Sequence, residues 1–317
     1  MEKSRVKRIH HKGRLTQIPI YLGKFFRMFI YEDDWKVVPM AGVIAALVAF
    51  VVGSNMFKTM EGTTMGSLGI TCICIWNGFF NSIQSICRER SIVKREHRSG
   101  MHITSYLLAH VIYQAFICVL QSAVTVAVCV VAKMSMPVIG FITPWFYLDM
   151  AITVFLITFA ADMMSLTVSS FAKTTTAAMT IMPFMLIFEL LFSGRMFQLS
   201  GFAETLTNLS LAKWGLNCLC TQASYNDLPM VTVWNQMVKF KNVSIMGETP
   251  IEDVVLYMQD NNLVSDFNLA VGHNSMIDEL NMTAKNIFNS WINLGLFACI
   301  FIVLTFFFLK RIDRDKR

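Results

Sequence analysis

ITSYLLAHVIYQAFICVLQSAVTVAVCVVA, residues 103–132, is an apolar run that contains no Asp, Glu, Lys or Arg. An α-helix rises about 1.5 Å per residue, so a helix formed by this run would be about 45 Å long. The hydrocarbon core of a bilayer is about 30 Å thick. The run is therefore long enough to cross a membrane, and it predicts a transmembrane helix.

Further apolar runs of the same character occupy most of the remaining chain. Hydrophobic residues make up 55% of the sequence, charged residues make up 15%, and the mean hydropathy is +0.52. A typical soluble domain has about 25% charged residues, so this composition excludes an ordinary soluble protein. We predict an all-α membrane protein with six transmembrane helices, at residues 37–57, 65–87, 103–132, 145–171, 176–198 and 287–309.

The basic residues are unevenly distributed over the segments between these runs. Of the 27 Lys and Arg residues, 20 lie in residues 1–36, 88–102 and 310–317 or at Lys173. Membrane proteins retain Lys and Arg on the cytoplasmic side. An even number of spans places both termini on one side. We therefore predict an integral protein of the plasma membrane with both termini in the cytoplasm.

The N-terminal segment is basic and does not have the pattern of a secretory signal. Residues 1–14 (MEKSRVKRIHHKGR) lack an apolar core and a small-residue cleavage site. Residues 18–31 (IPIYLGKFFRMFIY) are apolar but too short to span, and Lys24 and Arg27 interrupt them. This pattern predicts an amphipathic helix on the cytoplasmic membrane surface, which is in contact with lipid.

Four regions follow from these predictions. They are a basic cytoplasmic N-terminus at residues 1–36, five transmembrane helices at 37–199 with a cytoplasmic segment at 88–102, an external loop or cap at 200–285, and the last transmembrane helix with a cytoplasmic tail at 286–317.

The external region is too long to be a bare loop. Residues 251–267 (IEDVVLYMQDNNLVSDF) have apolar residues at helical spacing after an acidic start, which predicts an amphipathic helix. Cys218 and Cys220 are expected on the external side, where oxidation is possible, but neither a disulfide framework nor a metal site is expected. N-x-[ST] sequons begin at Asn208, Asn242 and Asn281.

Two segments carry more information than the apolar runs. Residues 88–100 (RERSIVKREHRSG) mix both charge signs with Ile92 and Val93, which suits either a solvated loop or a short helix that contacts a cytosolic partner. Residues 188–220 contain a polar break at Ser193 and Gly194, and then amphipathic pieces that return to the outer surface. Irregular backbone at membrane depth needs protein or a water-filled cavity beside it, so we expect a re-entrant segment.

These two segments together resemble the membrane half of ABC exporters of the G subfamily. The pattern E-x(6)-E-x-x-S-G matches Glu89, Glu96, Ser99 and Gly100, and the pattern FSG followed by Trp matches Phe192, Ser193, Gly194 and Trp214. The resemblance implies that Glu89, Arg95, Glu96, Ser99 and Gly100 couple the chain to an ATPase. It further implies an outer gate at Arg195 and Met196, although a cation there departs from the apolar gate of the family.

The same resemblance implies a dimer with a substrate cavity at its seam. The residues that it places in this cavity are Trp76, Asn77, Phe80, Leu186, Ile187 and Leu190. Ordinary helix packing is the alternative explanation for these apolar and aromatic side chains. The second permease subunit is either identical or different, and no nucleic acid partner is expected.

A phosphate-binding loop is missing from this sequence. In the pattern G-x-x-x-x-G-K-[ST], the pair Gly23 and Lys24 has Ile18 where the first glycine is required. We therefore expect no cofactor and no catalytic site on this chain. The resemblance then implies that ATP and Mg²⁺ bind to a separate ATP-binding subunit.

The Asp, Glu, Lys and Arg residues within the apolar runs are Asp149, Asp162, Glu189 and Arg195. A charge at mid-membrane is costly in lipid, so each is expected to face protein or water. Asp149 and Arg195 have similar predicted depth, which allows an ion pair that clamps two helices. Arg195 as a gate instead indicates a substrate with an anionic group. An unpaired Glu189 would be compatible with proton-coupled transport.

The expected function is that of a permease subunit in an ATP-driven exporter of an amphipathic, lipid-like, drug-like or peptide substrate. A membrane receptor or scaffold with a ligand-binding external loop is an alternative, and it would need no ATPase partner. A membrane-embedded enzyme is disfavoured, because no close His, Asp and Glu cluster with catalytic spacing is present.

Overall fold

The computed structural model describes residues 13–32, 34–53, 55–137, 139–197, 199–244 and 248–311. These residues form α-helices and short 3-10 helices joined by turns, and no β-strand occurs among them. The prediction of an all-α protein is therefore confirmed. Most of the basic N-terminal segment and of the C-terminal tail lies outside the described residues.

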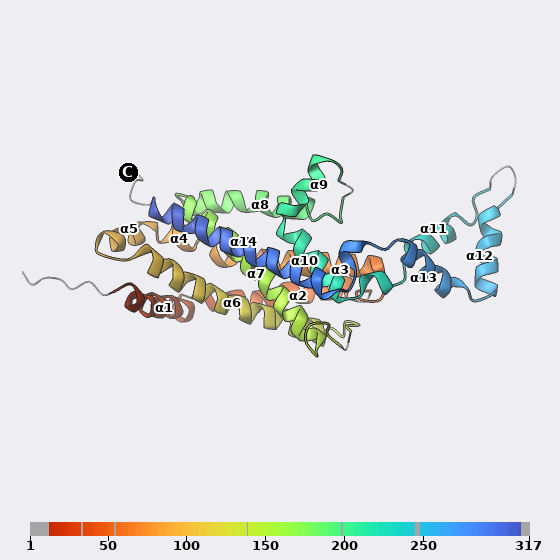
Figure 1. The fold of residues 1–317 in the computed structure, drawn as a ribbon, viewed down its shortest axis with the longest axis horizontal. Helices are drawn as coiled ribbons and strands as arrows, with labels where there is room; N and C mark the ends of the chain where they lie inside the picture. Colours follow the sequence, from red (N-terminus) through yellow and green to blue (C-terminus); the bar gives the residue numbers. More distant parts are fainter. Residues whose placement is uncertain are drawn as a thin grey trace, which may run out of the picture.

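The long helices of the described chain run along the long axis of the molecule (Figure 1). Spans Asp34–Val52, Ile103–Val131, Phe146–Phe171 and Ala284–Lys310 are long and apolar enough to cross a bilayer. These four correspond to predicted runs. The long helices are α2 (Val37–Val52), α3 (Met60–Ser82), α6 (Ile103–Val131), α7 (Phe146–Phe171), α8 (Thr175–Leu191) and α14 (Ala284–Lys310).

The remaining elements are the N-terminal helix and shorter helices, of which Leu211–Gln222 packs among the long helices. They are α1 (Arg14–Tyr31), η1 (Asp34–Lys36), α4 (Ser85–Arg88), α5 (Arg90–Arg98), α9 (Phe202–Leu206), η2 (Thr207–Leu209), α10 (Leu211–Gln222), η3 (Tyr225–Asp227), α11 (Thr232–Phe240), α12 (Pro250–Asp260), α13 (Val264–Asn274) and η4 (Asp278–Leu280).

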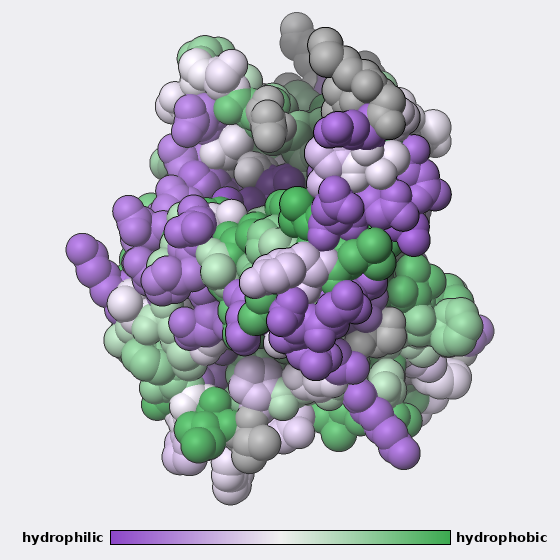
Figure 2. Space-filling model, turned by 90° about the vertical axis from the view of Figure 1, so that its right-hand side faces the viewer, coloured by the Kyte–Doolittle hydropathy of each residue, from purple (hydrophilic) through white to green (hydrophobic). Residues whose placement is uncertain are grey.

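The two ends of the bundle differ in the elements that they carry. Helices α1, α4 and α5 lie at one end together with the C-terminal end of α14, and we call this the α5 end (Figure 1). Helices α11 to α13 project from the opposite end, which we call the α12 end. Seen from there, the surface carries many hydrophilic residues with smaller apolar areas between them (Figure 2). The α12 end therefore has the character of a surface in water.

Helix α7 is the centre of the packing. It contacts α3, α6, α10 and α14, and its residues Met150, Ile157, Ala161 and Leu166 are fully buried. Gly78 of α3 allows the closest approach, because a Cβ atom at this position would lie 2.4 Å from the backbone oxygen of Thr158. The close contact between α3 and α7 thus requires glycine, a residue without a side chain, at position 78.

Several predicted boundaries were wrong. The run at 65–87 is a helix that starts at Met60, where the side chain of Thr59 accepts a hydrogen bond from the Gly62 amide at 3.1 Å. This helix ends at Ser82. The first amides of the short α4, at Ile86 and Cys87, then donate to Ser169 Oγ of α7.

The run at 176–198 also ends early, because α8 stops at Leu191. The chain then turns at Gly194, whose φ of +78° is in a region that favours glycine. The helix predicted at 251–267 is two helices, α12 and α13. Asn262 between them has φ +54°, a left-handed conformation that asparagine tolerates better than most residues.

Candidate functional site

Glu89 holds the α5 segment to the bundle. It lies between α4 and α5, and its residue exposure is 8%. Lys24 Nζ of α1 donates a hydrogen bond to Glu89 Oε2 at 2.8 Å, and the two side chains form an ion pair. The carboxylate thus faces α1, and the prediction that Glu89 couples the chain to an ATPase stays a prediction. Glu89 is a positioning residue for α5.

Helix α1 makes further bonds to the segment that follows α5. Gln17 Nε2 donates to the Gly100 carbonyl at 3.2 Å, and Gln17 Oε1 accepts from the His102 amide at 2.9 Å. Burial raises the pKa of Tyr21 to about 12, and the nearby carboxylate of Glu96 adds to the shift. Tyr21 therefore stays protonated at neutral pH. Helix α1 and the α5 segment are thus connected at several points.

Arg90 connects α5 to a third element. Its Nη1 donates to the backbone oxygen of Ser170 at 2.9 Å and to that of Ala172 at 3.1 Å. These two carbonyls belong to the last turn of α7 and the residue that follows it. The last carbonyls of a helix lack helical partners, and an Arg side chain satisfies them. The α5 segment is therefore tied to α7 as well as to α1.

One face of α5 remains open to a partner. Ser91, Ile92, Arg95 and Ser99 are exposed and lie at helical spacing, and Val93 faces the bundle with 1% exposure. Glu96, which was predicted to couple, is only half-exposed, and Gly100 (φ +110°) reverses the chain after α5. Sequence reasoning missed Lys24, Gln17 and Arg90. Lys24 had a signal, since it interrupts the apolar face of α1.

A polar cluster lies at the centre of the bundle. Asp162 of α7 has no exposed surface, and it accepts hydrogen bonds from Ser82 Oγ, from Asn81 Nδ2 at 3.4 Å and from Cys118 Sγ at 3.3 Å. The amides of Asn81 and Gln121 donate to each other at 2.9 and 3.0 Å. The cluster joins α3, α6 and α7, and Asp162 faces protein as expected.

Glu189 near the end of α8 holds the start of α10. Its Oε2 accepts from Ser210 Oγ at 2.7 Å and from the Ala212 amide at 2.9 Å. A carboxylate at a helix N-terminus satisfies free amides and interacts well with the helix dipole. These contacts give Glu189 a structural role. Proton-coupled transport stays an untested alternative.

Helix α10 returns into the bundle. It packs against α3, α7 and α14, and most of its side chains are buried. Cys218 and Cys220 have no exposed surface and are free thiols. The expectation that they face an oxidising exterior was therefore wrong, because the helix that carries them fills a space between the long helices.

Asp149 and Arg195 do not form the predicted ion pair. Asp149 is fully buried and accepts hydrogen bonds from the amides of Phe141, Ile142 and Thr143 at 2.9 to 3.0 Å, so it fixes the loop before α7. Arg195 lies 4.0 Å from Glu279 instead. The prediction failed because it continued helix α8 past Leu191. The chain turns there and directs Arg195 elsewhere.

Comparison with known proteins shows to which family this chain belongs. A family model described as ABC-2 type transporter matches residues 27–221, which is more than half of the chain. The chain belongs to the ABC-2 type transporter family. The match extends from α1 through the α5 segment to α10, and it therefore includes both segments on which the resemblance was based. The resemblance to an ABC transporter permease is confirmed.

A similar curated protein is a larger one. The chain is 26% identical over 152 residues to the ABC transporter ATP-binding/permease protein Rv1747 of Mycobacterium tuberculosis. The similarity covers 44% of this chain and 16% of that protein. The chain therefore spans a small part of the relative. The name of Rv1747 indicates that it has both an ATP-binding and a permease part.

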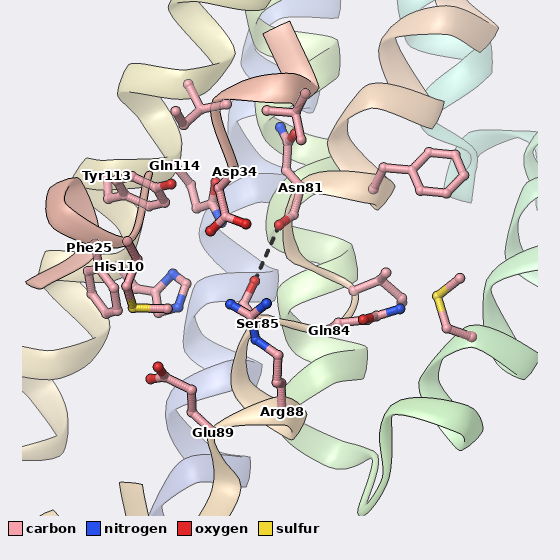
Figure 3. Close-up of a pocket in the computed structure, with 16 residues that line it drawn as sticks. Phe25, Asp34, Asn81, Gln84, Ser85, Arg88, Glu89, His110, Tyr113 and Gln114 are labelled. Atoms are coloured by element: carbon pink, nitrogen blue, oxygen red, sulfur yellow. Dashed lines mark hydrogen bonds between the residues drawn. The ribbon is translucent and has the colours of Figure 1, made fainter. Parts of the chain in front are cut away.

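In this ABC-2 type chain, a cavity of about 240 Å³ opens beside the α4–α5 junction (Figure 3). Asp34 of η1, His110 of α6, and Arg88 and Glu89 of the junction contribute to its wall. Phe80 also lines it, and it is the one predicted substrate residue among the lining residues. The cavity lies at the point where α1, α3, α4 and α6 meet, next to the elements tied to α5.

The predicted substrate residues belong to α3 and α8 and differ in exposure. Trp76 and Phe80 are exposed, and their rings contact each other at a centroid distance of 5.9 Å. Ile187 is exposed, Leu186 and Leu190 are half-buried, and Asn77 is buried. The structure thus leaves apolar side chains exposed on α3 and on α8, two helices that contact each other.

The predicted outer gate residues lie in the turn after α8. Met196 is exposed, whereas Arg195 lines a second cavity of about 480 Å³ at the start of α10. An apolar plug formed by two bulky side chains is not present at these positions. Arg195 therefore makes this part of the ABC-2 type fold polar.

Proposed function

We propose that the chain is the permease subunit of an ATP-driven ABC exporter with six membrane spans, α2, α3, α6, α7, α8 and α14. The α5 end faces the cytoplasm, and α1 lies at the membrane interface. The length of α3, 23 residues, and of α8, 17 residues, supports spans for both. The basic residues at the α5 end support this orientation.

The observation that carries the proposal is the attachment of α5 to two elements. Lys24 and Glu89 tie it to α1, and Arg90 ties it to the end of α7. An ATPase that moves the exposed face of α5 then moves α1 and α7 with it, since the contacts are short and partly buried. Because α7 packs on α3, α6, α8 and α14, the movement reaches most of the bundle.

The ATPase, with its ATP and Mg²⁺, is supplied by a separate ATP-binding subunit. A second permease subunit, identical or different, packs against the apolar surface formed by Trp76, Phe80 and Ile187, and the substrate is an amphipathic, lipid-like, drug-like or peptide compound. The exposure of this surface supports the seam. Membership of the ABC-2 type family argues against a receptor or scaffold.

Purification from native membranes tests the proposal. We expect an ATP-binding subunit to co-purify with the wild-type chain, and Arg95→Glu on the open face of α5 to reduce its yield at least about fivefold. Lys310→Glu, an exposed cation at the same end of the bundle, is the matched control and leaves the yield unchanged. Recovery of the chain without any ATP-binding subunit would refute the proposal.

A further inference from the structure

The cavity at the start of α10 is built from the turn after α8, from α9 and η2, from α10 and from the chain around η4. Its wall includes Ser193 and Arg195 from the turn after α8, Lys213 and Asn217 from α10, and Glu279 from η4. Gly194, also in the wall, has φ +78°, so the turn between Ser193 and Arg195 is one that a side chain would strain. The cavity volume of about 480 Å³ is enough for a small polar group.

Two cations in this cavity share Glu279 as a distant counterion. The side chains of Arg195 and Lys213 are 20% and 15% exposed, and each lies 4.0 Å from a carboxylate oxygen of Glu279. Arg195 makes no hydrogen bond within the described part of the chain, whereas Lys213 donates to Asn208 Oδ1 at 2.8 Å. A guanidinium normally forms two parallel bonds with an anion. Glu279 does not provide them.

Glu279 is a poorly fixed counterion. Its side chain is 60% exposed, and it accepts a hydrogen bond from Asn217 Nδ2 at 3.3 Å. The wall also contains a second exposed carboxylate, Glu204. The cavity therefore has no excess positive charge while Glu279 is in place. An anion can bind by taking the position of the Glu279 carboxylate between the two cations.

Two buried polar atoms of the wall have no partner. Ser193 has no exposed surface, and its hydroxyl finds no hydrogen-bond partner in the described chain. Asn217 is 5% exposed, and its Oδ1 is likewise unpartnered. Buried polar groups in native proteins are almost always satisfied, so a bound polar molecule is the expected partner. The hydroxyl offers a donor to an anion, and Oδ1 offers an acceptor to a hydroxyl group.

We propose that this cavity binds an anionic polar head that also carries a hydroxyl group, such as a glycerol phosphate head. Arg195, Lys213 and the Ser193 hydroxyl hold the anion, Asn217 Oδ1 accepts from the hydroxyl, and Glu279 is displaced. The inference rests on the proposed function in one respect only. In an exporter whose α5 end faces the cytoplasm, the opposite half of the bundle is where the substrate leaves. The head belongs either to a lipid-like compound or to a water-soluble one.

Calorimetric titration of the full chain in phosphatidylcholine nanodiscs, without nucleotide or ATPase, tests the site. The probes are dihexanoyl phosphatidylglycerol, dihexanoyl phosphatidylcholine and glycerol 3-phosphate. We expect the phosphatidylglycerol to bind at one site per chain, and Arg195→Gln or Lys213→Gln to weaken it at least about tenfold. Ser193→Ala, which changes no charge, weakens it about threefold. Lys239→Gln, an exposed lysine on α11, is the control and leaves it unchanged.

We expect Glu279→Gln to change the binding affinity in the opposite direction. Removal of the competing carboxylate strengthens binding at least about threefold, whereas a merely structural Glu279 predicts no gain. Three results would overturn the proposal. The first is that phosphatidylcholine binds as tightly as phosphatidylglycerol, and the second is that neither Ser193→Ala nor Arg195→Gln weakens binding. The third is that Glu279→Gln weakens binding. Equal binding of glycerol 3-phosphate supports the site and assigns it to a water-soluble compound. Because the ATPase is absent, these outcomes are independent of the co-purification test.

Discussion

Lys24→Met tests whether the ion pair with Glu89 anchors the α5 segment. The Lys24 and Glu89 side chains are 29% and 11% exposed, and the pair distance is 2.8 Å. Two charges about 4 Å apart attract by about 4 kcal/mol at an effective dielectric constant of about 20. Much of this attraction is offset by desolvation. Removing Lys24 alone leaves Glu89 buried without its partner, a change that costs about 3–5 kcal/mol for a fully buried pair.

The partial exposure of Lys24 lowers this figure, because water reaches the site. We expect Lys24→Met to reduce the free energy of unfolding by about 2 kcal/mol. The double variant Lys24→Met with Glu89→Met removes both charges and keeps similar volume, so it recovers most of the loss. Arg27→Met on the same helix is the control. Arg27 is exposed, and we expect a change within about 0.5 kcal/mol.

Denaturant titration of the purified variants in bicelles measures these values, and transport per ATP hydrolysed measures coupling in the assembled complex. We expect Lys24→Met to lower transport while ATP hydrolysis continues, because α5 then moves without α1. A loss no larger than that of Arg27→Met would refute the anchoring role. So would a double variant that is less stable than the Lys24→Met single variant.

The other predictions concern helix packing, assembly and the loop before α7. Gly78→Ala should lower the free energy of unfolding by at least about 2 kcal/mol, because its Cβ would lie 2.4 Å from a backbone oxygen. Gly295→Ala, whose Cβ would have no atom within 4 Å, should be nearly neutral, and thermal unfolding compares the two variants. Cysteines at Phe80 and Ile187 should cross-link between two chains in native membranes, and absence of such links would contradict the seam. Asp149→Asn should destabilise the chain by about 1–3 kcal/mol, since three amides lose a charged acceptor, and unchanged unfolding would show that these bonds contribute nothing.

Much of the fold was predictable because membrane insertion imposes a simple pattern. Runs at 103–132, 145–171 and 287–309 predicted α6, α7 and α14 within a few residues, since their apolar length is a direct physical requirement of the bilayer. The boundaries of α3 and α8 were less accurate. They are set by local bonds, such as the Thr59 cap and the turn at Gly194, which hydropathy does not register.

The candidate site was predicted only in part. The pattern from Glu89 to Gly100 located the α5 segment correctly, but it did not show that Glu89 faces α1. Asp149 and Arg195 were paired by predicted depth, although one binds backbone amides and the other lies beside Glu279, which is distant in sequence. Residues far apart in the chain come into contact only through packing, and a single sequence does not show which of them are in contact.

The sequence by itself determined the membrane class, most of the long helices, the basic end and the position of the α5 segment, because hydropathy and charge act locally along the chain. Only the tertiary structure decided which charges face inward and which side chains share a cavity. The burial of Cys218 and Cys220 on α10 is one example, and the approach of Arg195 to Lys213 and Glu279 is another. The physical reason is that a charged side chain takes the partner that packing brings within a few ångströms, and packing is a property of the whole fold.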